Sequence, residues 1–195
     1  MVNETSDPLY PVLVKICIIL VILFTGWLLW EHLLNRPKGS NEYSAANKAF
    51  EDKNYESAYK KYFKAYSIND KDVYVIEGMA RSLMELKRYD EAIEYFYLAI
   101  NTDSSFAPAY ANLAVLYDRL ENHEKAIELY EKAISLDYDL QKGMHWIDRI
   151  LHGFAKKPST IKDRLQYLKE QYLIREEDRI LSVPEIDDKQ PNYER

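Results

Sequence analysis

A 34-residue repeat constrains the fold of this 195-residue chain more than any other feature. Segment 73–106 can be laid on segment 107–140, so that YDEAIEYF from Tyr89 falls on HEKAIELY from His123. The small residues recur at the same interval, as Ala80 and Ala114, Ala92 and Ala126, and Ala99 and Ala133. Each unit holds two amphipathic helical patterns. A fixed period of this length predicts an all-α solenoid of stacked helical hairpins.

The same register extends one unit towards the N-terminus, over segment 39–72. That segment places Ala46, Tyr55, Ala58, Tyr62 and Ala65 where the period requires them. Three units are about the minimum that buries a continuous core. The alternative is an ordinary helical bundle with fortuitous periodicity.

The residues at fixed positions identify a family resemblance. The third unit reads Tyr110-x2-Leu113-Ala114-x2-Tyr117, followed by Ala126-x3-Tyr130 and Ala133. This pattern resembles the tetratricopeptide repeat (TPR) family, although the usual closing proline is replaced in every unit. The resemblance implies a TPR domain over 42–181, with repeats at about 39–72, 73–106 and 107–140. It also implies a concave groove that binds a peptide or a partner protein.

Segment 141–181 reads as a degenerate fourth unit followed by a C-terminal capping helix. Thr160 and Asp163 suit the start of that helix. Its apolar stripe is Ile161, Leu165, Leu168 and Tyr172, and its expected outward face is Lys162, Arg164, Lys169 and Glu170. Residues 182–195 are expected to form an unstructured tail. The alternative is that Val183, Ile186 and Tyr193 dock on a partner or on the chain's own groove.

The N-terminal part of the chain is unusually apolar. After a polar tail, 1–11, Lys15 is the only charged residue from Val12 to Trp30. Tyr10, Trp27 and Trp30 flank the run as interfacial aromatics do. Segment 12–34 is therefore predicted to be a transmembrane anchor helix, followed by a linker at 35–41. A cleaved signal peptide is the alternative, but the run is longer than a usual signal core.

The distribution of basic residues predicts the orientation of this single-pass protein. Arg36, Lys38, Lys48 and Lys53 follow the anchor, which favours a cytoplasmic repeat domain. An extracytoplasmic or periplasmic domain is the alternative. A single cysteine, Cys17, excludes an internal disulfide and a thiolate metal cluster.

Composition and motifs argue against several functional classes. The formal net charge of −6 gives no clustered basic face for nucleic acid. Phosphate loops, nucleophile elbows and paired-cysteine sites do not occur. His145 and His152 are too far apart along a helix for one metal ion, and His123 falls at a packing position. We therefore expect no enzyme activity, no cofactor and no metal.

The TPR resemblance implies which residues line the groove. They come from the first helix of each unit, and Arg81 and Arg149 occupy equivalent positions suited to acidic groups of a ligand. The expected partner-binding residues are Tyr43, Asn47, Tyr74, Arg81, Met84, Asn112, Val115, Arg119, Lys142, Trp146 and Arg149. Phe50 and Glu77 share this register. TPR domains that clamp chaperone C-terminal carboxylates use a Lys, Asn, Asn, Lys and Arg set, of which only Asn47 is matched when the comparison starts at the first unit. A comparison that starts one unit later gives Glu77, Arg81, Asn112, Lys142 and Trp146, which is also incomplete.

These features predict a non-catalytic, membrane-tethered adaptor that holds a partner protein for assembly of a membrane complex. Two alternatives remain open. One is a receptor for presequences or exported polypeptides, and the other is a scaffold in which the chain forms homo-oligomers through its repeats.

Overall fold

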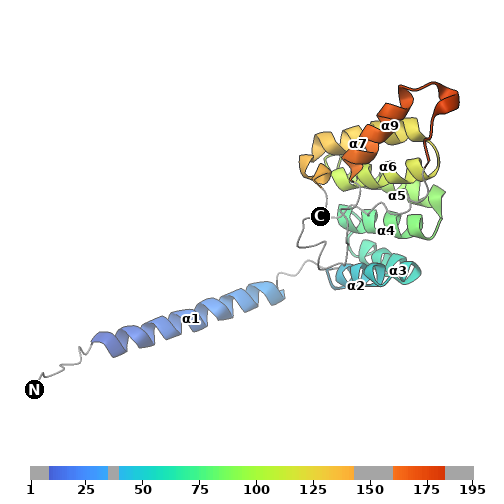
Figure 1. The fold of residues 1–195 in the computed structure, drawn as a ribbon. Helices are drawn as coiled ribbons and strands as arrows, with labels where there is room; N and C mark the ends of the chain where they lie inside the picture. Colours follow the sequence, from blue (N-terminus) through green and yellow to red (C-terminus); the bar gives the residue numbers. More distant parts are fainter. Residues whose placement is uncertain (1–8, 35–39, 143–159, 183–195) are drawn as a thin grey trace, which may run out of the picture. The chain divides into compact units, whose positions relative to one another are not determined.

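The computed structural model describes residues 9–34, 40–142 and 160–182. Every regular element in these ranges is a helix (Figure 1). The chain forms two compact units, Met1–Ser40 and Asn41–Arg195. Each unit is described by itself below.

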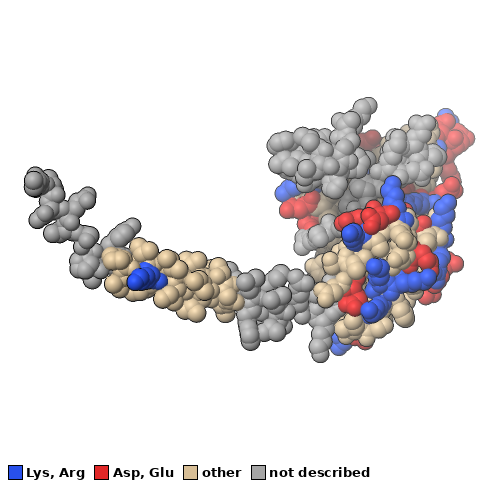
Figure 2. All heavy atoms as spheres, turned by 90° about the horizontal axis from the view of Figure 1, so that it is seen from below, with Lys and Arg blue, Asp and Glu red and all other residues tan. Residues whose placement is uncertain are grey.

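The described part of the first unit is helix α1, Leu9–Leu34. Side chains are described for residues 11–27, and all of them are exposed. The face of α1 seen in Figure 2 is uncharged apart from a basic patch, and Lys15 is the charged residue of segment 12–30. In the part of the chain with described side chains, no helix is long and apolar enough to cross a membrane. The predicted helix is thus present, whereas its transmembrane character is not supported.

Six helices of the second unit form three hairpins, one in each predicted repeat. They are α2 (Ser40–Glu51) with α3 (Tyr55–Tyr66), α4 (Val73–Glu85) with α5 (Tyr89–Thr102), and α6 (Ala107–Arg119) with α7 (His123–Leu136). Figure 1 shows the hairpins stacked in chain order. The predicted all-helical repeat solenoid is confirmed.

The loop inside each hairpin has one conformation that recurs with the sequence period. Lys53, Lys87 and Glu121 have positive φ angles of 58°, 61° and 61°. Non-glycine residues rarely adopt this left-handed region, which costs roughly 1–2 kcal/mol. Each hairpin accepts that cost at the same point, because the chain must reverse there within a few residues. The 34-residue period is therefore present in the backbone as well as in the side chains.

The ends of the units also repeat. The side-chain oxygens of Asn69, Asp103 and Asp137 each accept a hydrogen bond from the backbone N–H two residues later, at 3.3, 2.9 and 2.9 Å. Such turns replace the closing proline of the family pattern, because an Asn or Asp side chain can itself mimic a backbone turn.

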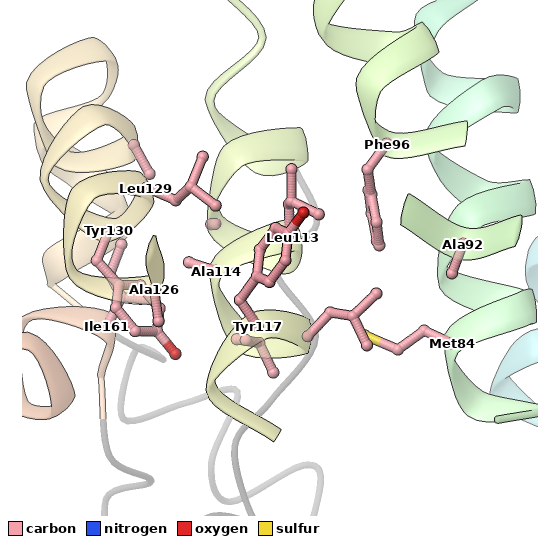
Figure 3. Close-up of a cluster of buried hydrophobic side chains, with 14 of the residues drawn as sticks. Met84, Ala92, Phe96, Leu113, Ala114, Tyr117, Ala126, Leu129, Tyr130 and Ile161 are labelled. Atoms are coloured by element: carbon pink, nitrogen blue, oxygen red, sulfur yellow. The ribbon is translucent and has the colours of Figure 1, made fainter. Parts of the chain in front are cut away.

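Small residues allow the helices to pack closely around large ones. Ala58, Ala92 and Ala126 are fully buried, as are Tyr62, Phe96 and Tyr130 four residues after each. Figure 3 shows side chains of α6, among them Leu113 and Ala114, between those of α4 and α5 on one side and α7 and α9 on the other.

Gly78 permits one especially close contact. A Cβ atom at this position would lie 2.5 Å from the ring of Tyr62, which no real packing tolerates. Glycine is therefore required where the first hairpin meets α4.

The C-terminal part holds the short helix η1 (Tyr138–Gln141), the capping helix α9 (Ile161–Tyr172) and the short helix η2 (Glu176–Asp178). Thr160 and Asp163 form a capping box at the start of α9. Ile161, Leu165 and Leu168 are buried, as the sequence predicts. Arg164 is the exception: it was expected on the outward face and is buried.

Candidate functional site

The predicted partner-binding residues of the second and third units lie on α4 and α6. Every side chain of α4 from Val75 to Met84 is buried, and every side chain of α6 from Ala107 to Asp118 except Tyr110 is buried. A helix enclosed on all sides must find partners for its polar side chains, because an unpaired buried polar group is costly.

Five of these side chains form a group that we call the inner-face cluster: Glu77, Arg81, Met84, Asn112 and Val115. None of the five residues is more than 4% exposed. Arg81 Nε donates to Glu77 Oε2 at 3.0 Å, and Asn112 Nδ2 donates to Glu77 Oε1 at 2.8 Å. Glu77 therefore joins the first helices of two successive units.

The electrostatics of Glu77 are set by two opposing effects. Burial raises the pKa of its carboxyl, because the charged form loses its hydration. The positive charge of Arg81 and the hydrogen bonds from Arg81 and Asn112 act in the opposite direction. The guanidinium of Arg81 also lies 4.6 Å from the ring centroid of Phe50 in the first unit. The network thus connects all three units. Its contacts hold the first helices of these units together, and ligand binding by Arg81 and Asn112 stays a prediction.

The other predicted residues are more accessible. Tyr74 is 46% exposed, and its ring packs edge-on against Phe106 with centroids 5.0 Å apart. Tyr43 and Asn47 are half-buried, and Asn47 accepts a hydrogen bond from Tyr62. Lys142 is exposed, and its ammonium lies 2.7 Å from the carboxylate of Asp139.

Arg119 carries an unsatisfied donor. Its Nη1 bonds Glu85 at 3.2 Å, but its Nε is buried without a hydrogen-bond partner. A buried donor left unpaired costs about 1–3 kcal/mol, which an acceptor brought by a partner would recover.

Two predicted residues, Trp146 and Arg149, lie outside the described residues, as do His145 and His152. The proposed equivalence of Arg81 and Arg149 therefore stays a prediction.

Asp118 is a centre that sequence reasoning missed. Arg164 donates two hydrogen bonds to its carboxylate, from Nε to Oδ2 at 2.6 Å and from Nη2 to Oδ1 at 2.9 Å. His123 Nδ1 lies 2.8 Å from Oδ1, and the Tyr130 hydroxyl donates to Oδ2 at 3.4 Å. Residues 118, 123 and 164 are nearly fully buried. This network fixes α9 to the third hairpin.

The sequence did contain a signal for this centre. Asp118 falls at the register position of Phe50 and Met84, two buried apolar residues. A carboxylate at a buried position requires a charged or hydrogen-bonding partner.

Among the described residues, no group of three His, Cys, Asp or Glu is arranged to hold a metal ion. A surface pocket of about 470 Å³ lies on α6 and α7 and contains none of the predicted residues in its lining. Its described lining is Tyr110, Glu128, Leu129, Glu131, Lys132 and Ser135.

Comparison with known families agrees with this geometry. A tetratricopeptide repeat model matches residues 107–137, and another model of the same description matches residues 77–106. The chain contains tetratricopeptide repeats. These two matches cover most of the third TPR unit and most of the second. The first unit is assigned from the hairpin α2–α3 and its 34-residue register.

Solved structures show the same fold. The first TPR of Spaghetti (RPAP3) bound to the HSP90 peptide SRMEEVD has 18% identity and a TM-score of 0.55, over 70% of this chain and 94% of that one. MamA has 21% identity and a TM-score of 0.50, over 53% of this chain and 61% of that one. Such low identities establish the TPR fold alone. A comparison with curated proteins finds no match.

Proposed function

We propose that this protein is a non-catalytic adaptor, which α1 attaches to a membrane and whose TPR domain holds a partner protein during assembly of a membrane complex. One observation carries the proposal: a helix of exposed apolar side chains precedes a domain of TPR hairpins in the same chain. TPR units stack into extended surfaces that bind peptides and proteins. No step of the proposal requires catalysis.

Two features support a partner site on the first helices of the TPR units. Tyr74 offers an exposed aromatic surface, and aromatic side chains are frequent anchors of protein interfaces. Arg119 supplies the buried donor that lacks an acceptor. The Spaghetti (RPAP3) relative binds a chaperone peptide. Because this chain matches the residues of that clamp incompletely in either register, we propose a different peptide or protein as its partner.

The exposed side chains of α1 support attachment to a membrane. The described stretch, 11–27, has 17 residues, which is short of the roughly 20 that span a bilayer. In the sequence the apolar run continues through Leu28, Leu29 and Trp30, and α1 extends to Leu34. We therefore keep the single-pass topology, with the repeat domain in the cytoplasm, as part of the proposal.

Alkaline extraction of cell membranes tests the attachment. We expect the full-length protein to stay in the membrane pellet, and the variant with Leu20→Asp and Leu23→Asp to move to the supernatant, since charges are poorly tolerated in hydrocarbon. Phe63→Asp is the matched control, because Phe63 is similarly exposed but lies in the TPR domain. Extraction of the unaltered protein by alkali would contradict the proposal.

Isolation of the protein in mild detergent tests the adaptor role. We expect one or a few proteins to co-purify in near-stoichiometric amounts. Co-purification of a broad set of unfinished or presequence-bearing chains would instead support the receptor hypothesis. If only further copies of this chain co-purify, and light scattering gives a mass that rises with concentration, the scaffold hypothesis would be supported instead.

A further inference from the structure

We propose that the C-terminal segment of this chain, residues 183–195, occupies the inner-face cluster and competes there with the partner. The competition rests on the proposed function. The docking itself is tested without any partner, so that its failure would leave the adaptor role open.

The first step is the burial of the cluster. Glu77, Arg81 and Met84 share one side of α4, because residues four and seven apart on a helix lie nearly above one another. Met79 lies two residues from Glu77, about 200° around the helix, and packs into the hydrophobic cluster of the first hairpin. Both sides of α4 are buried, and the structure holds one chain. The neighbouring helices supply part of the cover over the cluster, since Met84 and Val115 belong to the hydrophobic core of the second and third units and Phe50 lies against Arg81. We assign the rest of the cover to the tail.

The second step is the place where the described chain ends. Arg164 Nη2 donates to the carbonyl oxygen of Leu181 at 2.8 Å, and the same nitrogen bonds Asp118. Residue 181 is thereby held beside the C-terminal end of α6. Asn112 and Val115 lie on that helix, and six residues from Asp118 to Asn112 correspond to roughly 9 Å. The segment after residue 181 therefore starts near one end of the inner-face cluster.

Two further contacts fix this direction. The Tyr167 hydroxyl donates to the carbonyl oxygen of Ile180 at 2.6 Å, and the Ile180 N–H donates to Gln171 Oε1 at 2.8 Å. The segment that leads to residue 183 is thus bound along α9 and does not need to be ordered again when the tail docks. The ordering cost falls only on the residues beyond it.

The third step is reach and chemistry. Segment 183–195 has 13 residues, which extend to at most about 47 Å. That length exceeds the few turns of α4 and α6 that carry the cluster. Val183, Ile186 and Tyr193 provide apolar side chains for Met84 and Val115. A tethered ligand acts at an effective concentration in the millimolar range, so that modest contacts suffice to hold it.

Cysteine protection in the full-length chain tests the docking. In a Cys17→Ser background, Met84→Cys should react slowly with a maleimide. Replacing Val183, Ile186 and Tyr193 together by serine should raise its labelling rate at least tenfold. Tyr138→Cys is the control, because Tyr138 is 67% exposed and its labelling should not depend on the tail.

A second measurement uses no cysteine in the cluster. A fluorescent peptide of sequence 183–195 should bind saturably to the serine-substituted full-length protein and not to the unaltered protein, whose own tail fills the site. A scrambled peptide should bind neither. Unchanged protection of Met84→Cys together with absence of peptide binding would overturn the proposal, and would assign the cover to the repeats or to segment 143–159.

Discussion

At the residue scale, the TPR register explains where charge is tolerated inside this protein. Phe50, Met84 and Asp118 occupy one position in three successive units. The first two are apolar and face a following hairpin. The third lies where the repeats end, and it pairs with Arg164 of the capping helix. The third hairpin therefore contacts α9 through an ion pair at this position, whereas the contacts between hairpins use apolar side chains there.

We predict that Arg164→Ala lowers the free energy of unfolding of the TPR domain by roughly 3–5 kcal/mol, because it leaves the Asp118 carboxylate buried without the guanidinium that pairs with it. Urea denaturation followed by circular dichroism measures the change. Replacing both residues by leucine should recover much of the loss, since no buried charge then remains.

Arg88→Ala is the matched control. Arg88 pairs with Glu91 at 2.6 Å, but both side chains are more than 40% exposed. An exposed pair contributes little to stability, because water and salt screen the attraction. Equal losses for Arg164→Ala and Arg88→Ala would show that the Asp118 network does not hold the cap.

The sequence predicted the apolar stripe of α9 but placed Arg164 on the wrong face. Helical periodicity reports which side of a helix is apolar, and it assigns charged residues to water by default. It contains no information on a carboxylate 46 residues away. The contacts of Arg81 with Glu77 and Phe50 were likewise not visible in the periodicity, and ligand binding by Arg81 stays a prediction.

At the scale of the element, the hairpins were predictable because three signals agree. Apolar spacing gave the two helices, small residues gave their close packing, and the fixed period gave the register. The left-handed residues Lys53, Lys87 and Glu121 were not predictable, because no glycine marks these turns.

The second helices of the first and third units begin with the same cap. Asn54 accepts a hydrogen bond from the N–H of Ser57, and Asn122 accepts one from Lys125. Arg88, at the equivalent position of the second unit, makes no such bond. The second unit therefore starts its second helix without this stabilisation.

We predict that Asn122→Ala destabilises the TPR domain by about 1 kcal/mol, the usual cost of losing a helix cap. Chemical denaturation measures the change. Asn101→Ala, at an exposed position within α5, should have little effect. A loss at Asn101 as large as that at Asn122 would argue against the capping role.

At the scale of the whole molecule, the chain combines an apolar helix with a TPR domain. The repeats were predictable from self-similarity within the chain, since each unit contacts mainly its neighbours. The accessibility of the binding face was not predictable, because it depends on what packs over α4 and α6. Exposed Tyr74 and buried Met84 lie ten residues apart on the same helix.

The central claim is that the first helices of the repeats bind a partner protein at a membrane. Site-specific photo-crosslinking in the native cells tests it most directly, with the crosslinker at position 74 and, as the control, at position 63 on the second helix α3. We predict a discrete adduct with one membrane-complex protein from position 74, recovered in the membrane fraction, and none from position 63. Equal adducts from both positions, or none from position 74, would contradict the claim.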